Sequence, residues 1–249
     1  MDTYRGQLTM AYEDLAAFYD ELMGDALYHA WQKALAPHLS SVRVAVDLGC
    51  GTGRMAAWLA ERAERVYAVD RSPEMLAVAF DTWGHLANVH WLESDLGDLA
   101  LPEAADFALA STDVLNYILT RDELERVLQR VRACVRPGGK WALDTLGPRR
   151  IQQLHNGAWH DVRDHLVIVH ETEVEGERIV HRVCGFFGID EEGALYRRFD
   201  EEHVQRYWDA ATLAELLDRT GWEVVEVQGD FGESPVDQAD RVVWVLKRR

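Results

Sequence analysis

The residues in this chain that are best suited to chemistry form a glycine-rich turn directly after an apolar strand. Residues 44–48 read Val-Ala-Val-Asp-Leu, and glycines follow at positions 49, 51 and 53, before a helix-like segment of residues 54–65. Glycine lets the backbone approach a ligand closely or adopt a positive φ. Backbone N–H groups at the start of a helix favour nucleotide-type ligands. The pattern therefore predicts a nucleotide-binding turn.

The spacing of this turn disfavours two common nucleotide sites. A dinucleotide-binding turn reads G-x-G-x-x-G, and its last position is Arg54 in this chain. A phosphate-binding P-loop requires a lysine after its last glycine, and this turn contains none. An NAD-type oxidoreductase stays open as an alternative, disfavoured by Arg54.

Further motifs follow in order along the chain. Asp70 and Asp95 each come at the end of an apolar strand, and a turn at residues 136–139 precedes the fifth strand. Ser72 and Pro73 have the residue types of an N-cap and a first helical position. Together with the glycine turn, these motifs resemble those of class I methyltransferases that use S-adenosylmethionine (SAM).

The resemblance implies how SAM is held. In the family, the acid after the second strand accepts both ribose hydroxyls, and Asp70 matches it. The acid after the third strand accepts the adenine amino group, and Asp95 matches it, while Met75 packs near the adenine. Cys50 is the small residue beside the cofactor, and a nucleophilic role for its thiol is the alternative. The residues assigned to SAM in this way are Tyr12, Tyr19, Asp47, Gly49, Cys50, Gly51, Asp70, Arg71, Met75, Asp95, Leu96 and Ser111.

The opening of the chain narrows the resemblance to one group within this family. Residues 12–23 and 112–118 are similar to the corresponding segments of the YqeM-like bacterial group of methyltransferases. Sugar-amine N,N-dimethyltransferases share a looser version of the same opening. The likeness implies that residues 1–34 form a helical lid over the cofactor, with Tyr12 in contact with it. The helical spacing of apolar residues in this segment also fits simple packing.

Strands and helices alternate over residues 42–146, which predicts an α/β fold with a parallel sheet. The resemblance implies a Rossmann-like seven-stranded methyltransferase sheet in which this segment is the SAM-binding core. Residues 209–249 supply a last helix, capped by Asp209, and then strands six and seven. We expect residues 1–249 to form a single domain.

Residues 155–208 depart from this alternation. Apolar and polar residues alternate with period two over most of the segment, and turn residues at 175–177 and 191–194 separate the runs. This predicts an antiparallel β insertion after strand five, on the substrate side of the sheet. We expect solvent-facing residues of the insertion, such as Arg182 and Arg198, to influence acceptor turnover. A dimer interface is the alternative role.

Methyl transfer from SAM depends on alignment more than on acid–base catalysis. The sulfonium is already a strong electrophile, so the enzyme mainly positions a nucleophile and excludes water. Ligands of such sheets bind at the carboxyl ends of the strands. Candidates for the acceptor pocket are therefore Asn116 and Tyr117 after strand four, and Trp159 and His160 after strand five. His160 has a side chain that can accept a proton near neutral pH, or it is an ordinary surface histidine.

Composition limits the partners. A formal net charge of −17 repels nucleic-acid phosphates, and no run of 18 apolar residues suits a membrane. The acidic, aromatic start does not resemble a signal peptide. Three cysteines without paired spacing suit a reducing cytoplasm, and metal-ligand spacing is absent.

The function that these residues favour is SAM-dependent methyl transfer to nitrogen or oxygen of a small molecule, by a monomer or homodimer. A non-catalytic SAM sensor or interaction protein is one alternative, and a methyltransferase of a protein or RNA is another. The sequence does not identify the acceptor or a general base.

Overall fold

A seven-stranded sheet forms the centre of the molecule. The computed structural model describes residues 11–155, 157–189 and 195–249. The strand order is β10-β11-β5-β4-β1-β2-β3. Neighbouring strands from β3 to β5 run parallel, and β11 runs antiparallel to both β5 and β10. The strands are β1 (Val44–Leu48), β2 (Arg65–Asp70), β3 (Val89–Glu93), β4 (Ala105–Ala110), β5 (Val135–Leu146), β10 (Trp222–Gly229) and β11 (Arg241–Arg248).

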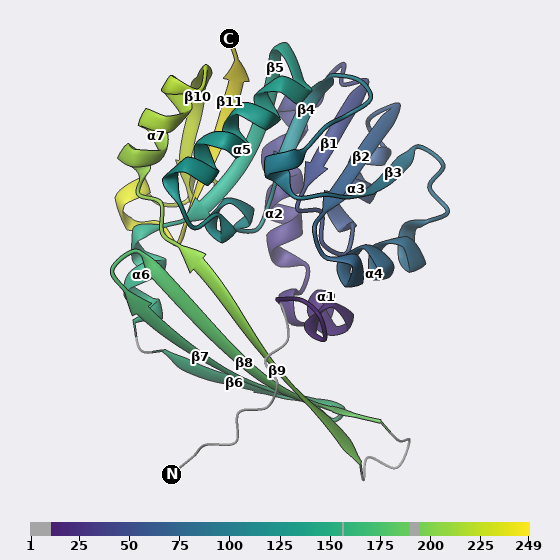
Figure 1. The fold of residues 1–249 in the computed structure, drawn as a ribbon, viewed down its shortest axis with the longest axis vertical. Helices are drawn as coiled ribbons and strands as arrows, with labels where there is room; N and C mark the ends of the chain where they lie inside the picture. Colours follow the sequence, from purple (N-terminus) through teal and green to yellow (C-terminus); the bar gives the residue numbers. More distant parts are fainter. Residues whose placement is uncertain (1–10, 156, 190–194) are drawn as a thin grey trace.

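Helices cover both faces of this sheet (Figure 1). Helices α5 (Arg121–Cys134) and α7 (Ala210–Arg219) pack on one face. Helices α2 (Ala26–Leu35), α3 (Arg54–Ala60) and α4 (Pro73–Trp83) pack on the other. Every residue of β1 is buried, as expected for a central strand that is covered on both sides. The sequence prediction of a Rossmann-like seven-stranded sheet is confirmed.

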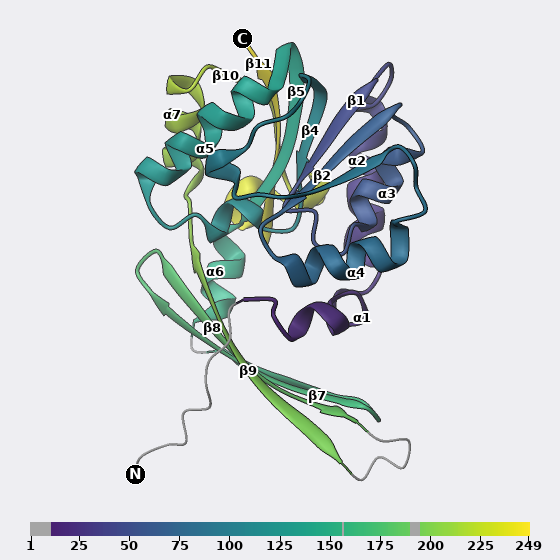
Figure 2. The same ribbon diagram turned by 45° about the vertical axis from the view of Figure 1, so that its right-hand side comes forward.

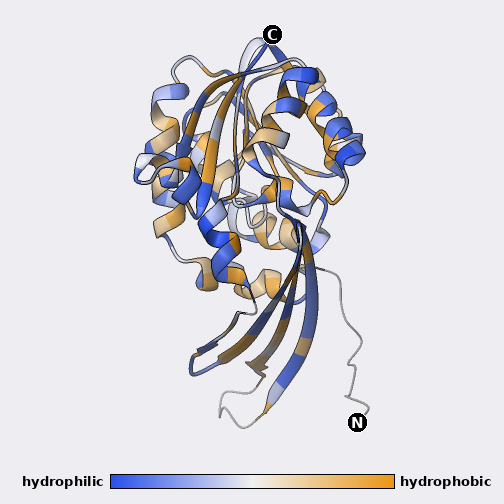
Figure 3. Cartoon of the chain, turned by 90° about the vertical axis from the view of Figure 1, so that its left-hand side faces the viewer, coloured by the Kyte–Doolittle hydropathy of each residue, from blue (hydrophilic) through white to orange (hydrophobic). Residues whose placement is uncertain are grey.

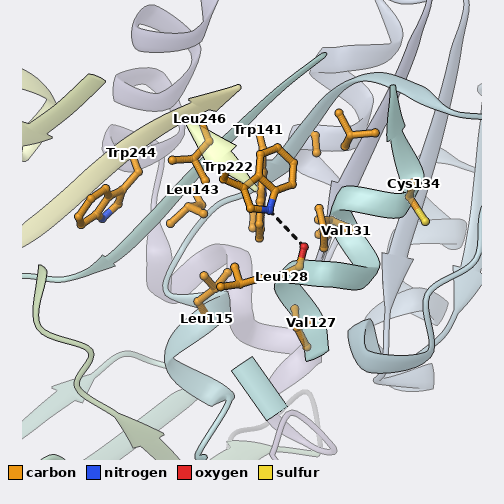
Figure 4. Packing of buried hydrophobic residues seen from close by; sticks show 14 of the residues in the cluster. Leu115, Val127, Leu128, Val131, Cys134, Trp141, Leu143, Trp222, Trp244 and Leu246 are labelled. Atoms are coloured by element: carbon orange, nitrogen blue, oxygen red, sulfur yellow. Dashed lines mark hydrogen bonds between the residues drawn. The ribbon is translucent and has the colours of Figure 1, made fainter. Parts of the chain in front are cut away.

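Large aromatic side chains fill the layer between α5, α7 and the sheet. Trp141 and Trp222 are fully buried there, with ring centroids 5.1 Å apart. The indole Nε1 of Trp222 donates a hydrogen bond to the backbone oxygen of Leu128, 3.1 Å away (Figure 4). The buried indole N–H thus has a partner, which removes the cost of burying an unpaired donor.

Helices α4, α5 and α7 each begin directly after a capping residue in the sequence. Ser72 accepts a hydrogen bond from the Met75 amide, and Pro73 is the first residue of α4. Thr120 and Glu123 form a reciprocal capping box at the start of α5. Asp209 accepts hydrogen bonds from two backbone amides of α7.

The insertion after β5 is a second sheet of four antiparallel strands in the order β6-β7-β8-β9. Its strands are β6 (Ala158–Val162), β7 (Leu166–Glu175), β8 (Arg178–Gly188) and β9 (Tyr196–Arg206), and α6 (Pro148–Leu154) precedes them. The long strands project away from the core beyond α1 (Tyr19–Met23) (Figure 2). The predicted turn at 175–177 is confirmed, whereas the one at 191–194 lies outside the described residues.

Period-two alternation gives this second sheet two different faces, and the colours change repeatedly along its strands in Figure 3. Its inner face carries a small apolar cluster that includes Leu166, Val183 and Phe199 and packs against Leu15. Its outer positions carry ion pairs, such as Arg182 with Glu173 at 3.0 Å. The inner face therefore joins the insertion to the rest of the chain.

The predicted lid of residues 1–34 divides into two parts, and residues 1–10 lie outside the described ranges. Trp31 and Leu35 of α2 are fully buried in the cluster beneath the sheet, so α2 is a core helix. The 3₁₀ turn η1 (Leu15–Phe18) and α1 lie between the core and the insertion (Figure 1). Among the described residues, no helix is long and apolar enough to cross a membrane.

Candidate active site

The glycine turn after β1 has the backbone conformation that the sequence pattern requires. Gly49 has a φ of 66° and Gly51 a φ of 52°, both in the left-handed region. A Cβ atom at Gly49 would also lie 2.6 Å from a methyl carbon of Val114. A side chain at this position is therefore excluded by both strain and space.

A cavity of about 470 Å³ lies beside this turn, at the carboxyl ends of the strands. The resemblance assigned twelve residues to SAM, and the structure brings eleven of them together around this cavity. These lining residues are Tyr12, Tyr19, Gly49, Cys50, Gly51, Asp70, Arg71, Met75, Asp95, Leu96 and Ser111. The volume lies within the range of small-molecule sites.

Backbone amides fix the carboxylate of Asp70 at the end of β2. Its Oδ2 accepts a hydrogen bond from the Gly51 amide at 2.8 Å, and its Oδ1 accepts one from the Ser72 amide at 2.9 Å. A carboxylate oxygen has two lone pairs, so each oxygen can still accept a ligand hydroxyl. These two acceptor oxygens fit the two ribose hydroxyls of SAM.

The twelfth residue, Asp47, lies beneath the turn and not in the cavity wall. Its side chain is 1% exposed, and neither carboxylate oxygen has a hydrogen-bond partner in the described part of the chain. Burial raises its pKa to about 7, and the charge of Asp70 adds to the shift. Two acids near the turn favour a cationic ligand, and the sulfonium and ammonium groups of SAM meet that requirement.

Cys50 does not have the surroundings of a nucleophile. Its side chain is buried, and this burial, together with the nearby Asp47 and Asp70 charges, raises the pKa of the thiol well above its usual value. The thiolate is the reactive form of cysteine. The surroundings of Cys50 therefore fit the role of a small, neutral residue better than the role of a nucleophile.

A second cavity of about 430 Å³ adjoins the first, and the two share a wall. Tyr12, Tyr19, Thr112 and Tyr117 line both cavities and thus form this wall. The hydroxyl oxygens of Tyr12 and Tyr117 are 2.6 Å apart. The far side of the second cavity is the inner face of the insertion. The two cavities are therefore suited to hold two reactants next to each other.

Three histidines on the inner face of the insertion line the second cavity: His170, His181 and His203. The Nε2 of His170 lies 3.0 Å from the Nδ1 of His181, whose Nε2 lies 3.1 Å from the Oε1 of Gln205. Burial and the neighbouring His181 lower the pKa of His170 to about 4, and burial also lowers the pKa of His181. These two imidazoles are thus neutral near pH 7 and offer hydrogen bonds without charge. Sequence reasoning missed all three, although they occupy alternating inward positions.

The structure places the four candidates for the acceptor pocket in different environments. Tyr117 lies in the shared wall and Trp159 lines the second cavity, but His160 is exposed on β6 and lines neither cavity. Asn116 is fully buried: its Nδ2 donates to the Arg206 oxygen at 2.7 Å, and its Oδ1 accepts from the Leu146 amide at 3.1 Å. Asn116 therefore ties the turn after β4 to the end of β5 and to β9.

The segment that precedes α1 is held to the insertion by one buried carboxylate. Glu201 accepts hydrogen bonds from the backbone amides of Tyr12 at 2.9 Å, Asp14 at 2.7 Å and Leu15 at 2.8 Å. The same segment supplies Tyr12 to both cavities. The segment that lines the first cavity through Tyr12 therefore also contacts the insertion.

This arrangement leads to a prediction about the mobility of residues 12–23. We expect hydrogen exchange of these amides to slow when SAM is added, because the ligand completes the packing beneath Tyr12 and Tyr19. Amides of α7, none of whose residues lines this cavity, serve as the internal control. Equal protection of residues 12–23 with and without SAM would contradict a closing segment.

Comparison with known proteins extends these observations. Residues 45–139 match a family model described as a methyltransferase domain. YqeM of Bacillus subtilis strain 168, which is named as a methyltransferase, is 26% identical over 244 residues that cover 96% of this chain and 98% of that protein.

Solved structures with the same fold cover nearly the whole chain. A SAM-dependent methyltransferase from Clostridium acetobutylicum ATCC 824 has a TM-score of 0.84 and 23% identity, covering 95% of this chain and 98% of that one. The sugar N-methyltransferase KedS8 from Streptoalloteichus sp ATCC 53650 has a TM-score of 0.76 and 21% identity, covering 100% and 97%. These likenesses therefore include the insertion as well as the central sheet.

Proposed function

Because the chain is a class I SAM-dependent methyltransferase, similar to the YqeM-like group, we propose that it methylates a nitrogen or oxygen atom of a small molecule. The observation that carries this proposal is the pair of cavities that share one wall. The cofactor cavity holds the SAM motifs, and the second cavity, of about 430 Å³, has the size of a small-molecule site. The acceptor would occupy the second cavity.

The residues of the first cavity have defined roles in this proposal. When bound, SAM would supply an electrophilic methyl group on a cationic sulfur. The acceptor nucleophile would bond to the methyl carbon, and the sulfur would leave as the thioether of S-adenosylhomocysteine. Asp70 binds the ribose hydroxyls, Asp95 and Met75 bind the adenine, and Tyr12 and Tyr19 cover the cofactor. The wall residues exclude water from the point where the two reactants meet, which favours transfer to the acceptor over hydrolysis.

The lining of the second cavity supports a polar acceptor. His181 and Gln205 are neutral hydrogen-bonding groups on its inner wall. Arg150 and Arg241 also line it, and Arg241 forms an ion pair with Asp113 at 2.8 Å. KedS8, which shares the fold, is described as a sugar N-methyltransferase. A hydroxylated amine is therefore a suitable first class of acceptor to screen.

The proposal is tested by the transfer of labelled methyl from SAM into a metabolite extract. We expect label in the fraction of small molecules, and clearly less label when Asp70→Ala protein replaces the wild type at a SAM concentration near the wild-type Kd. Extract fractions that contain protein or RNA are assayed in parallel. Label that appears only in those fractions would refute the small-molecule acceptor, and wild-type protein that binds SAM but labels no fraction would favour a sensor.

A further prediction concerns the residues that select the acceptor. The sequence pointed to Arg182 and Arg198, but both lie on the outer face, in ion pairs with acidic neighbours. We therefore expect Gln205→Ala to raise the KM for the acceptor by about tenfold, since it removes a buried hydrogen-bonding group from the cavity wall. Arg182→Ala is the matched control on the opposite face.

The affinity for SAM should stay within about twofold in both variants, because neither residue lines the cofactor cavity. Titration calorimetry measures the SAM affinity, and steady-state kinetics measure the KM for the acceptor. A raised KM in Arg182→Ala together with an unchanged KM in Gln205→Ala would reverse the assignment of the two faces.

A further inference from the structure

A continuous row of hydrogen bonds connects the wall between the cavities to a buried carboxylate in the insertion. The Tyr12 and Tyr117 hydroxyl oxygens are 2.6 Å apart, and the Tyr117 oxygen lies 3.1 Å from Nδ1 of His203. The Nε2 of His203 lies 2.9 Å from Oε2 of Glu201. Glu201 is fully buried and His203 is 4% exposed. We refer to these four side chains as the Tyr–His–Glu row.

The direction of the hydrogen bonds follows from the charge of Glu201. Burial alone would raise the pKa of this carboxyl group, but the hydrogen bonds from His203 and from the backbone amides of Leu15, Asp14 and Tyr12 outweigh burial and lower it. An ionised carboxylate only accepts hydrogen bonds, so Nε2 of His203 must carry the proton. In the neutral imidazole, Nδ1 is then an acceptor. Tyr117 therefore donates to His203, and Tyr12 donates to Tyr117.

The placement of the row matches the place where a proton is released. Tyr12 and Tyr117 line both cavities, whereas Glu201 lines neither and lies behind His203. Glu201 and His203 are two residues apart on β9, so both side chains project from the inner face. The polar end of the row is thus at the meeting point of the reactants, and its charged end is sealed from solvent.

We propose that the Tyr–His–Glu row carries away the proton that the acceptor loses when it is methylated. This inference rests on the proposed transfer to nitrogen or oxygen. The acceptor proton passes to the Tyr12 oxygen, the Tyr12 proton passes to Tyr117, and the Tyr117 proton passes to Nδ1 of His203. The products are a neutral methylated acceptor and an imidazolium ion next to the Glu201 carboxylate. The proton returns by the same route after the product leaves.

In this proposal Glu201 and His203 are positioning residues, because they act through the tyrosines. Glu201 fixes the tautomer of His203 and stabilises its charged form, in the way that a carboxylate orients the histidine of a hydrolase triad. The groups that surround His203 and its partners come from several elements. The titratable or charged groups among them include Asp14, Tyr19, Asp70, Arg71, Asp113, Arg150, His170 and His181.

The first test needs no acceptor. In ¹⁵N-labelled protein at pH 8 with S-adenosylhomocysteine added, we expect His203 to show a protonated Nε2 and an unprotonated, hydrogen-bonded Nδ1. Tyr117→Phe removes only the hydroxyl and should shift the Nδ1 resonance towards that of a free imidazole nitrogen. Tyr196→Phe, at the exposed end of β9, is the matched control and should leave it unchanged. A proton on Nδ1 in the wild type would overturn the proposal.

The second test uses the acceptor that the extract assay yields. We expect His203→Gln and Tyr117→Phe to lower kcat by about 100-fold, within the usual range for acid–base catalysis. The Kd for SAM should change by less than about twofold in His203→Gln, because His203 does not line the cofactor cavity. Imidazole in the buffer should restore part of the activity of His203→Gly. His90→Gln, on the exposed side of β3, is the control.

The outcomes separate this inference from the proposed function. If the wild type methylates a small molecule and His203→Gln does so at the same kcat, the row is only structural and the inference fails. If the wild type labels only macromolecules, the proposed function fails. The tautomer of His203 then still decides whether the hydrogen bonds of the row have the direction that the proton transfer requires.

Discussion

Replacing Asp70 by alanine is expected to weaken SAM binding by at least about tenfold. The carboxylate is suited to accept both ribose hydroxyls, and each charge-assisted hydrogen bond contributes roughly 1.5–3 kcal/mol. The substitution also removes the hydrogen bonds to the Gly51 and Ser72 amides, which hold the glycine turn against the start of α4. Binding and the shape of the turn should both be affected, and titration calorimetry with SAM measures the loss.

Two further variants separate these contributions. Asp70→Asn keeps one acceptor oxygen of similar position and should lose less affinity than Asp70→Ala. Glu93→Ala is the matched control, because Glu93 pairs with Asp70 across β2 and β3 but is exposed and lines neither cavity. An Asp70→Ala protein that binds SAM as tightly as the wild type would refute the assignment of Asp70 to the ribose.

The central fold and the cofactor turn could be predicted because their signals are local. Positive φ at Gly49 and Gly51, the cap at Ser72 and the capping box at Thr120 each depend on a few consecutive residues. The resemblance to class I methyltransferases then supplied the Rossmann-like seven-stranded sheet, which is confirmed.

The acceptor side could not be predicted to the same depth, because its residues meet only through long-range packing. Asn116 bonds to the backbone of Arg206 and Leu146, and no local pattern indicates those partners. The period-two pattern around His181 and His203 shows which neighbouring residues share a face of each strand. Only the pairing of β8 with β9 shows that both histidines lie on the inner face of the insertion. The division of the opening segment between lid and core likewise depends on where α2 packs.

The same reasoning explains why His160 attracted attention from the sequence. It follows the fifth strand, where acceptor pockets form in such folds, but β6 pairs with β7 in a register that leaves its side chain exposed. Trp159, one residue earlier, takes the opposite face and lines the second cavity. A shift of one residue along a strand therefore decides which side chain reaches the site.

The buried acid under the glycine turn should have a large effect on stability. Burial raises the pKa of Asp47 to about 7 in the folded protein, whereas the unfolded value is near 3.8. The folded state thus binds the proton more tightly, so this group favours folding at low pH and loses that contribution as the pH rises from about 4 to 7. At pH 8 the difference costs about 4 kcal/mol, since each pKa unit corresponds to about 1.4 kcal/mol.

Asp47→Asn removes this titration, and without ligand the variant should gain stability relative to the wild type as the pH rises. Urea unfolding at pH 5.5 and 8 should show a relative gain of about 2 kcal/mol between the two values. Asp81→Asn, on the exposed side of α4, should show no such gain. Parallel pH dependence of the wild type and Asp47→Asn would contradict a raised pKa.

SAM would offset the free-energy cost of burying Asp47 beneath the glycine turn. A cationic ligand near the turn stabilises the ionised form of Asp47, whose carboxylate oxygens have no hydrogen-bond partner among the described residues. SAM should therefore stabilise the wild type more than Asp47→Asn at pH 8, and its binding should release a fraction of a proton from the wild type near pH 7. Calorimetry in two buffers of different ionisation enthalpy measures that proton. Equal proton release by the wild type and Asp47→Asn would place its source elsewhere.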